Sequence, residues 1–279
     1  MQSVEGRTVL ITGAARGMGE IYARRAVAEG ARAVILWDLD QAALDEVSAS
    51  LADAPTRVLA QRVDIGSLDD ITKAAAKARK DVGAPDILIN NAGIVRGGAF
   101  WEHDPVTGID ATMRINAIAH MWVAREFLPD LMADTGTPKR ILNIASAAGT
   151  LANPGMTVYA ASKWAMLGWS DSLRLELRRK GYGHIRVTTF CPSYISTGMF
   201  EGARGPLLTP ILTPERATDA AWRAMLRGKA ILYKPWTVRL SVLLRGLLPL
   251  RAWDFVAGRV FGVYSTMDHF TGRPEQAAK

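Results

Sequence analysis

The order of strand, glycine-rich loop and helix at the start of the chain constrains the fold more than any other feature. The apolar run TVLIT at 8–12 is followed by the pattern TGxxxGxG, with Gly13, Gly17 and Gly19, and then by a helical pattern. Glycine permits a tight turn and a close backbone approach, and the N–H groups that open the next helix can bind a pyrophosphate. The segment therefore predicts a dinucleotide-binding unit.

Strand and helix patterns continue to alternate along the chain. The further strand patterns are AVILWDLD, TRVLAQRVDIGS, PDILINNAG, RILNIAS, HIRVTTFCP and KAILYKP. This alternation predicts an α/β fold, a Rossmann-type doubly wound parallel sheet of about seven strands with helices on both faces and the ligand at the strands' carboxyl ends. We expect a single domain over 1–279, with KAILYKP as an edge strand and a helical C-terminal extension.

Composition argues against several classes of protein. The net charge is +7, but the basic residues are dispersed and no basic-aromatic motif for nucleic acid is present. The four histidines lack metal-ligand spacing, so we expect no metal site. The single cysteine, Cys191, excludes an internal disulfide and lies in an apolar strand pattern. The first strand begins too early to leave room for a signal peptide, so we expect a cytoplasmic protein.

Asp38 ends the second strand pattern, at about the 20-residue spacing expected of a carboxylate that binds the adenosine ribose. Such a carboxylate repels a 2′-phosphate, which favours NAD over NADP. Arg16, inside the glycine loop, has the opposite effect because it could face that phosphate. We give Asp38 the greater weight, since its repulsion is direct. Its alternative role is to cap the helix that begins near Asp40.

Polar residues also follow the third and fourth strand patterns. Asp64 could meet the adenine amine or hold a strand-end turn, and the amides and small residues at 90–93 suit a floor beneath a cofactor. Asn116 lies in a helical pattern over about 105–132, where asparagine is unfavourable. It could bend the helix, bind a water or face solvent.

Ser146, Tyr159 and Lys163 indicate proton-transfer chemistry. Tyr159 and Lys163 are four residues apart in a helical pattern, so they share a helix face, and Ser146 ends a strand pattern. An ammonium beside a phenol stabilises the phenolate, so we expect the pKa of Tyr159 to fall from about 10, and a cationic nicotinamide ring nearby could supply part of a shift to near neutrality. Ser146 could donate a hydrogen bond to the same substrate oxygen. By itself, such a Tyr–Lys pair is more often a half-buried aromatic beside a solvated amine.

Taken in order, TGAARGMG, Asp64, NNAG, Asn116, Ser146, YAASK and CPSYIST resemble the motifs of the short-chain dehydrogenase/reductase family, over residues 7–197. The resemblance implies that Tyr159 is the acid/base and that Lys163 lowers its pKa and holds the nicotinamide ribose. It also implies that Ser146 positions the substrate oxygen and that Asn116 anchors a water in the proton relay.

The resemblance also implies an NAD(P)-binding set. Thr197 would contact the nicotinamide carboxamide. The expected cofactor-binding residues are Gly13, Ala15, Arg16, Gly17, Met18, Gly19, Asp38, Leu39, Asp64, Ile65, Asn91, Ala92, Gly93, Tyr159, Lys163, Pro192, Ile195 and Thr197. The family usually has Pro-Gly where this chain has Pro192-Ser193, which leaves the local loop conformation open.

A narrower resemblance is to the retinol and hydroxysteroid dehydrogenase branch, through LWDLD, ISTGMFEG, KPW and MDHFTGR. It implies a lipophilic retinoid, steroid or fatty alcohol, or its carbonyl, as substrate. Members often carry an N-terminal membrane segment, which we do not find here, so we expect a soluble or peripherally attached protein. The resemblance also implies a homodimer or homotetramer, with the helices around Ala117 and Leu173 as interfaces.

Residues 194–212 are rich in glycine and proline and open a substrate-loop region, 194–228. We expect a mobile lid over the substrate. Its apolar inner surface would be formed by Met199, Phe200, Leu207, Leu208 and Ile211. The alternative is a surface loop with its own small apolar cluster.

The apolar stretch 236–266 is interrupted by Arg239, Arg245, Pro249, Arg251 and Arg259, so it cannot span a bilayer. The arginines do not share a helix face, so we expect no amphipathic stripe. The stretch could pack against the lid as a helical pair, form a subunit interface or touch a membrane peripherally. We favour packing and a role in the pocket wall.

These features predict an NAD-dependent oxidoreductase that interconverts a lipophilic primary or secondary alcohol and its carbonyl. The nearest alternative is an NADPH-dependent carbonyl reductase, because Arg16 could hold a 2′-phosphate. A nucleotide-sensing or membrane-associated scaffold would keep the fold without turnover. The intact Ser146, Tyr159 and Lys163 argue against that last alternative.

Overall fold

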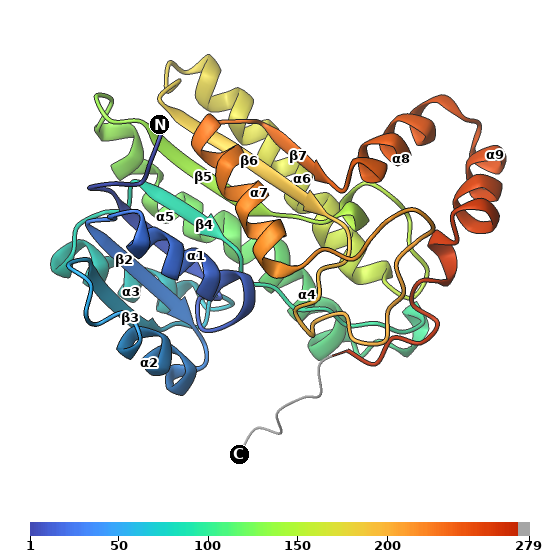
Figure 1. Cartoon of the computed structure of the whole chain (residues 1–279), viewed down its shortest axis with the longest axis horizontal. Coiled ribbons are helices and arrows are strands. Elements are labelled where there is room, and N and C mark those ends of the chain that lie inside the picture. Colours follow the sequence, from blue (N-terminus) through green and yellow to red (C-terminus); the bar gives the residue numbers. More distant parts are fainter. Residues whose placement is uncertain (273–279) are drawn as a thin grey trace.

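The centre of the molecule is a seven-stranded parallel sheet (Figure 1). In the computed structural model, which describes residues 1–272, its order is β3-β2-β1-β4-β5-β6-β7. The strands are β1 (Thr8–Thr12), β2 (Ala33–Asp38), β3 (Arg57–Arg62), β4 (Ile87–Asn90), β5 (Lys139–Ile144), β6 (Ile185–Pro192) and β7 (Ile231–Lys234). The strand order reverses between β1 and β4, where doubly wound sheets bind ligands. The predicted Rossmann-type fold is confirmed, with KAILYKP as an edge strand.

The helices cover the two faces of the sheet because side chains along each strand alternate. Val9 and Ile11 of β1 belong to a core cluster formed with α1 (Gly17–Ala28), α2 (Gln41–Ala49) and α7 (Pro214–Arg227). Leu10 belongs to the opposite cluster, formed with α3 (Leu68–Asp81), α5 (Ala119–Ala133) and α6 (Thr157–Arg179). Cys191 is fully buried in β6, as its apolar pattern predicted.

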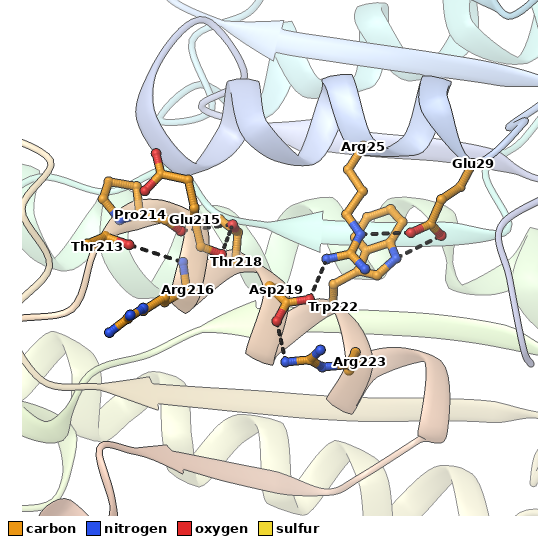
Figure 2. Close-up of polar contacts among 10 residues, drawn as sticks. All are labelled: Arg25, Glu29, Thr213, Pro214, Glu215, Arg216, Thr218, Asp219, Trp222 and Arg223. Atoms are coloured by element: carbon orange, nitrogen blue, oxygen red, sulfur yellow. Dashed lines mark hydrogen bonds and ion pairs between the residues drawn. The ribbon is translucent and has the colours of Figure 1, made fainter.

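Helix α7, which follows the substrate loop, is fixed to α1 by polar and aromatic contacts (Figure 2). Arg25 of α1 donates to Asp219 at 3.0 Å and lies over the ring of Trp222. The indole nitrogen of Trp222 in turn donates to Glu29 at 3.0 Å. Helix α7 is far from α1 in the sequence, since Arg25 and Asp219 are 194 residues apart, and it supports the helix that follows the glycine loop.

The helical region predicted over about 105–132 is present, but two segments of it are π-helical. They are η2 (Pro105–Asp110) and η3 (Arg114–Ile118), separated by the short α4 (Ala111–Met113) and followed by α5. Asn116 lies within η3. A π-helical turn widens the helix locally, and such turns are common beside functional sites.

The C-terminal third adds helices beyond β7. Helices α8 (Trp236–Leu247) and α9 (Leu250–Phe255) project from the end of the sheet (Figure 1), and α9 continues into a π-helical turn and a 3-10 turn, Val263–Ser265. The predicted helical extension is confirmed. Arg273, the last residue of the MDHFTGR motif, lies outside the described residues. Within 1–272, no helix is both long and apolar enough to cross a bilayer.

The substrate loop is joined to this C-terminal segment through the main chain. The N–H groups of Arg204, Leu207 and Thr271 donate to carbonyls on the other segment, at 2.9, 2.9 and 3.0 Å. An isolated bridge between Ile195 and Leu212 closes the base of the loop. Residues 194–212 thus form a cover that main-chain hydrogen bonds attach to the C-terminal segment.

Candidate active site

The glycine-rich loop leads from β1 into α1 and packs against residues that follow β4. Gly13 has φ +64°, and a Cβ there would lie 2.8 Å from Ala92 Cα. A Cβ on Gly19 would collide with the Gly13 carbonyl, whereas one on Gly17 would approach nothing nearer than Thr197, at 3.9 Å. The loop is therefore tightly packed at Gly13 and Gly19. It is open at Gly17, where α1 begins without a side-chain cap.

A long pocket extends from this loop to α6, and we call it the nucleotide pocket. It contains about 1380 Å³ of space, counting the part open to solvent. The predicted residues that line it are Gly13, Arg16, Gly17, Met18, Asp38, Leu39, Asp64, Ile65, Asn91, Ala92, Gly93, Ser146, Tyr159, Lys163, Pro192, Ile195 and Thr197. The free N–H groups at the start of α1 suit a pyrophosphate in this pocket.

Two predicted cofactor-binding residues, Ala15 and Gly19, do not line the nucleotide pocket. The Ala15 N–H donates to Asp38 at 3.0 Å, which ties the loop to the end of β2. Gly19 lets α1 approach the Gly13 carbonyl. Both residues shape the loop from behind.

Asp38 lies at the end of β2 with one carboxylate oxygen on the Ala15 N–H and the other on the Asp40 N–H, at 3.2 Å. The helix cap is Asp40, whose carboxylate accepts from the Ala43 N–H. The alternative in which Asp38 caps α2 is therefore wrong. Arg16 forms an ion pair with Asp40, so its charge is partly neutralised within the protein.

Asp64 and Asn91 hold turns at the floor of the nucleotide pocket. The Asp64 carboxylate accepts from the Gly66 N–H at 2.8 Å, which is the predicted turn role, and its side chain also lines the pocket. The Asn91 amide donates to the carbonyls of Thr12 and Gly13, at 3.0 and 3.1 Å. The loop after β4 is thereby fixed to the glycine loop.

Asn116 is fully buried, so the alternative in which it faces solvent is wrong. Its side-chain oxygen accepts from the Ile94 N–H at 2.8 Å, and its amide donates to the Ile94 carbonyl and to Ser162 Oγ. A Cβ on Gly93 would lie 3.2 Å from Asn116 and 3.7 Å from Lys163 Nζ. Asn116 therefore supports the pocket floor from directly behind it, beside the lysine.

Ser146, Tyr159 and Lys163 meet where the nucleotide pocket joins a second pocket. Ser146 follows β5 and caps a 3-10 turn, and the other two lie on α6. Lys163 Nζ donates to the Ile144 carbonyl at 3.0 Å and lies 5.7 Å from the centre of the Tyr159 ring. All three side chains are largely buried. The predicted shared helix face is thus present, and the amine is not solvated.

The pKa of Tyr159 in the protein alone differs from our expectation. Burial of the phenol raises its pKa above 10, a hydrogen bond with Ser146 works in the opposite direction, and Tyr194 adds to the rise. Burial also lowers the pKa of the Lys163 ammonium, from 10.5 to about 8. Desolvation therefore outweighs the hydrogen bond with Ser146, and the expected fall in the Tyr159 pKa does not occur in the chain by itself.

The second pocket, which we call the substrate pocket, contains about 940 Å³ of space, counting its open side. Ser146, Tyr159, Ser193 and Phe200 line both pockets. The ring of Phe200 packs edge-on against Tyr159 and Tyr194, with centroids 5.8 and 5.4 Å apart. Most of the remaining wall is apolar and comes from 147–156, the substrate loop, α8 and the C-terminal segment.

A buried polar network in the substrate pocket was missed by the sequence reasoning. Tyr194 Oη donates to Thr266 Oγ1 at 2.8 Å and accepts from Asn153 Nδ2 at 3.2 Å. The three residues are far apart in the chain, so no local pattern could have revealed the network. The apolar wall of the nucleotide pocket was missed as well, because the sequence does not distinguish it from core. It includes Trp37, Val63, Ile94 and Ile115.

The predicted apolar inner surface of the lid is only partly present. Met199 and Phe200 line the nucleotide pocket, and Phe200 and Leu208 line the substrate pocket. Leu207 and Ile211 line neither pocket and are 59% and 48% exposed. The prediction was wrong for these two because main-chain hydrogen bonds to the C-terminal segment, rather than a continuous apolar face, hold the loop.

Among residues 1–272, no cluster of three or more His, Cys, Asp or Glu side chains could hold a metal ion. His120 is fully buried, with Nε2 2.9 Å from the Ala92 carbonyl, and burial lowers its pKa to about 3. It therefore stays neutral and supports the same floor as Asn116.

Comparison with known proteins agrees with this geometry. The family model for short chain dehydrogenases matches residues 7–206. Mouse epidermal retinol dehydrogenase 2 is 35% identical over 278 residues, covering 99% of this chain and 88% of its own. Rat estradiol 17-beta-dehydrogenase 11 is 30% identical over 260 residues, covering 93% and 85%.

Solved structures share the fold. A short chain dehydrogenase/reductase from Burkholderia phymatum, in complex with NAD, has a TM-score of 0.80 at 24% identity, covering 88% of this chain and 95% of its own. One from Burkholderia cenocepacia, in complex with NADP, has a TM-score of 0.73 at 28% identity, covering 90% and 96%. The predicted family resemblance is confirmed. The chain belongs to the short-chain dehydrogenase family, as an oxidoreductase of CH–OH groups related to the retinol and steroid dehydrogenases.

Proposed function

We propose that the protein is an NAD-dependent oxidoreductase that interconverts a lipophilic primary or secondary alcohol and its carbonyl. The observation that carries this proposal is that Ser146 and Tyr159 line both pockets, with Lys163 beside them in the nucleotide pocket. A substrate oxygen placed at the junction would reach the two hydroxyl groups from the substrate side.

The residues present fit a dinucleotide. The open space above Gly17, the uncapped start of α1 and the carboxylate of Asp38 at the end of β2 match a pyrophosphate and an adenosine ribose. Lys163 and Thr197 line the same pocket, which suits the ribose and carboxamide roles implied by the family resemblance. When bound, the cofactor supplies the acceptor or donor of hydride and a positive charge at the oxidised ring.

Each catalytic residue has a defined task in this proposal. Tyr159 Oη takes the hydroxyl proton during oxidation and returns it during reduction. Ser146 Oγ holds the substrate oxygen in place. Lys163, buried beside Tyr159, contributes positive charge when protonated, which offsets the effect of burial on the phenol. Asn116 supports the floor, and its π-helical turn would anchor the water of the proton relay.

The apolar wall of the substrate pocket supports a lipophilic substrate, as do the retinol and estradiol named for the relatives. We infer that region 194–228 begins with the cover of this pocket. A hydrophobic site of this size gains affinity from the apolar area removed from water, about 25 cal/mol per Å². The class of alcohol, retinoid, steroid or fatty, is therefore set by shape.

Exchange of Tyr159 for Phe tests the proposal. Removal of the phenol hydroxyl should lower kcat about 10²- to 10⁴-fold, while NADH still binds, because general acid/base catalysis contributes that range. Turnover of a retinoid, steroid and fatty alcohol panel and NADH fluorescence titration are the measurements. Ser196→Ala, on the loop that follows β6 and outside both pockets, is the control. Equal turnover by Tyr159→Phe would defeat the catalytic assignment.

Cofactor choice has its own test. Asp38→Ala should reduce the preference for NAD over NADP about tenfold or more, because a carboxylate repels a 2′-phosphate directly. An unchanged ratio of the two Kd values would mean that Asp38 does not discriminate. The second candidate, an NADPH-dependent reductase, is favoured by Arg16 in the pocket and by the neighbour crystallised with NADP. Tighter NADPH binding by the unaltered protein would select it.

We also propose a homodimer or homotetramer on the cytoplasmic side, in solution or peripherally attached to a membrane. Ala117 and Leu173 are themselves buried within the chain, so an interface would use the outer faces of α5 and α6. Light scattering of the purified protein decides the subunit count, and a monomer at micromolar concentration would overturn the proposal.

A further inference from the structure

Helices α8 and α9 project beyond the sheet (Figure 1), and together with the π-helical turn Val256–Val260 they carry exposed apolar side chains. These are Trp236, Leu243, Leu247, Leu250, Phe255 and Val260, between 47% and 73% exposed. With Arg239, Arg251 and Arg259 they form what we call the hairpin surface. Large apolar side chains left exposed together on one part of a protein mark an interaction site.

The spacing of these residues places them on one side of α8. Trp236, Leu243 and Leu247 are seven and four residues apart, so they follow one helix face, with Arg239 among them. The inner face of the same helix carries Thr237 and Val238, which are buried, and Ser241, and all three line the substrate pocket. The arginines do not form a separate face, as expected, because Arg239 lies among the apolar residues of this stripe.

The charges of the hairpin surface are of one sign. No carboxylate pairs with Arg239, Arg251 or Arg259 within the described residues. The one acidic residue of α8 and α9, Asp254, accepts a hydrogen bond from Tyr264 Oη at 2.6 Å. Exposed arginines beside leucine and tryptophan match anionic lipid headgroups above an acyl layer, with tryptophan at the boundary.

A second copy of the chain fits this surface less well. A two-fold contact brings the same patch of both copies together, so the arginines of each copy would face those of the other. Asp254 is the one acidic residue of α8 and α9 that could neutralise them. Like charges buried at an interface are unfavourable. The surface is therefore complementary to an anionic layer and not to itself.

The mouth of the substrate pocket lies at the edge of this surface. Trp236 and Leu208 both line the substrate pocket, and both are 67% exposed. Trp236 belongs to the wall formed by α8, and Leu208 belongs to the wall formed by the substrate loop. A ligand that left an acyl layer past Trp236 would enter the pocket without crossing water.

We propose that the hairpin surface docks on an anionic lipid bilayer and turns the mouth of the substrate pocket towards it. Docking is peripheral, since α8 and α9 are too short to span a bilayer. The inference relies on the proposed function only for the use of the pocket, and the docking itself does not require turnover.

Vesicle co-flotation of the full chain tests the docking. The unaltered protein should bind vesicles of phosphatidylcholine with about 30 mol% phosphatidylserine at least tenfold more tightly than the double variant Leu243→Glu/Leu247→Glu. Arg239→Gln/Arg251→Gln/Arg259→Gln should lose the preference for phosphatidylserine over phosphatidylcholine alone. Val106→Glu, an exposed apolar residue outside the hairpin surface, should bind like the unaltered protein.

Three outcomes would overturn the proposal. These are no vesicle binding by the unaltered protein, equal binding by the double variant, or a double variant that turns an oligomer into a monomer while vesicle binding persists. The last outcome would assign the surface to a second copy. Both leucines are exposed, so the variant should keep its unfolding midpoint in urea, which is measured alongside.

The orientation of the mouth has a separate readout. Leu208→Cys, labelled with a polarity-sensitive fluorophore, should shift its emission to the blue on these vesicles, while labelled Val106→Cys should not. Cys191 is fully buried and does not compete for the label. No shift at position 208 during vesicle binding would refute the orientation. Failure of every alcohol in the turnover panel would overturn the proposed function and leave these two measurements unaffected.

Discussion

The nucleotide pocket and the substrate pocket meet at Tyr159 but are built by different means. The nucleotide pocket is shaped by main-chain geometry. Its glycines allow the backbone to approach closely, and the side-chain amide of Asn91 donates to two main-chain carbonyls of the glycine loop. The substrate pocket is shaped by side chains from distant segments, such as Tyr194 and Thr266. A main-chain cradle needs particular residues at fixed spacing, whereas a side-chain wall admits many solutions.

The largest expected difference between the two regions concerns glycine. Gly19→Ala places a methyl group against the Gly13 carbonyl and should destabilise the protein by about 3 kcal/mol. Gly246→Ala, in α8, meets nothing within 4 Å and should stabilise it by about 0.5–1 kcal/mol. Urea unfolding measures both free energies. Similar effects at the two positions would break the contrast between the regions.

A second prediction concerns the buried lysine at the junction of the pockets. The folded pKa of Lys163, about 8, lies below its unfolded value of 10.5, so the unfolded chain binds more protons between these values. Its contribution to stability therefore rises with pH over this window, by about 2 kcal/mol between pH 8 and 10.

The stability advantage of Lys163→Met over the unaltered protein should shrink by that amount. Urea unfolding of both proteins at pH 8, 9 and 10 measures it. The comparison removes the opposite trends from Cys191 and Tyr22, whose pKa values burial raises. A constant difference between the proteins across these pH values would contradict the prediction.

The smallest effect tests whether side chains hold the substrate pocket together. Tyr194→Phe removes a hydroxyl that donates to Thr266 and accepts from Asn153. Each of Tyr194→Phe and Thr266→Val should cost about 1–2 kcal/mol, with a coupling of about 1 kcal/mol in a double-mutant cycle. Purely additive changes in unfolding free energy would mean that the network does not act as a unit.

The same contrast explains what the sequence could predict. The glycine spacing, the strand alternation and the Ser146, Tyr159 and Lys163 motifs predicted the fold and most of the nucleotide pocket, because each reflects a local geometric need. The Tyr159 pKa was misjudged, since burial is a property of the whole fold. The Tyr194 network, the outward Leu207 and the exposed stripe of α8 depend on contacts between distant segments, which spacing does not encode.

The attachment of the substrate loop to the C-terminal segment has an evolutionary consequence. The bonds from Arg204, Leu207 and Thr271 join main-chain atoms, so they do not depend on which side chains these positions carry. Mutation can therefore exchange side chains of the cover while the cover stays attached. A duplicated gene could acquire a new substrate preference through such exchanges without first losing a closed pocket.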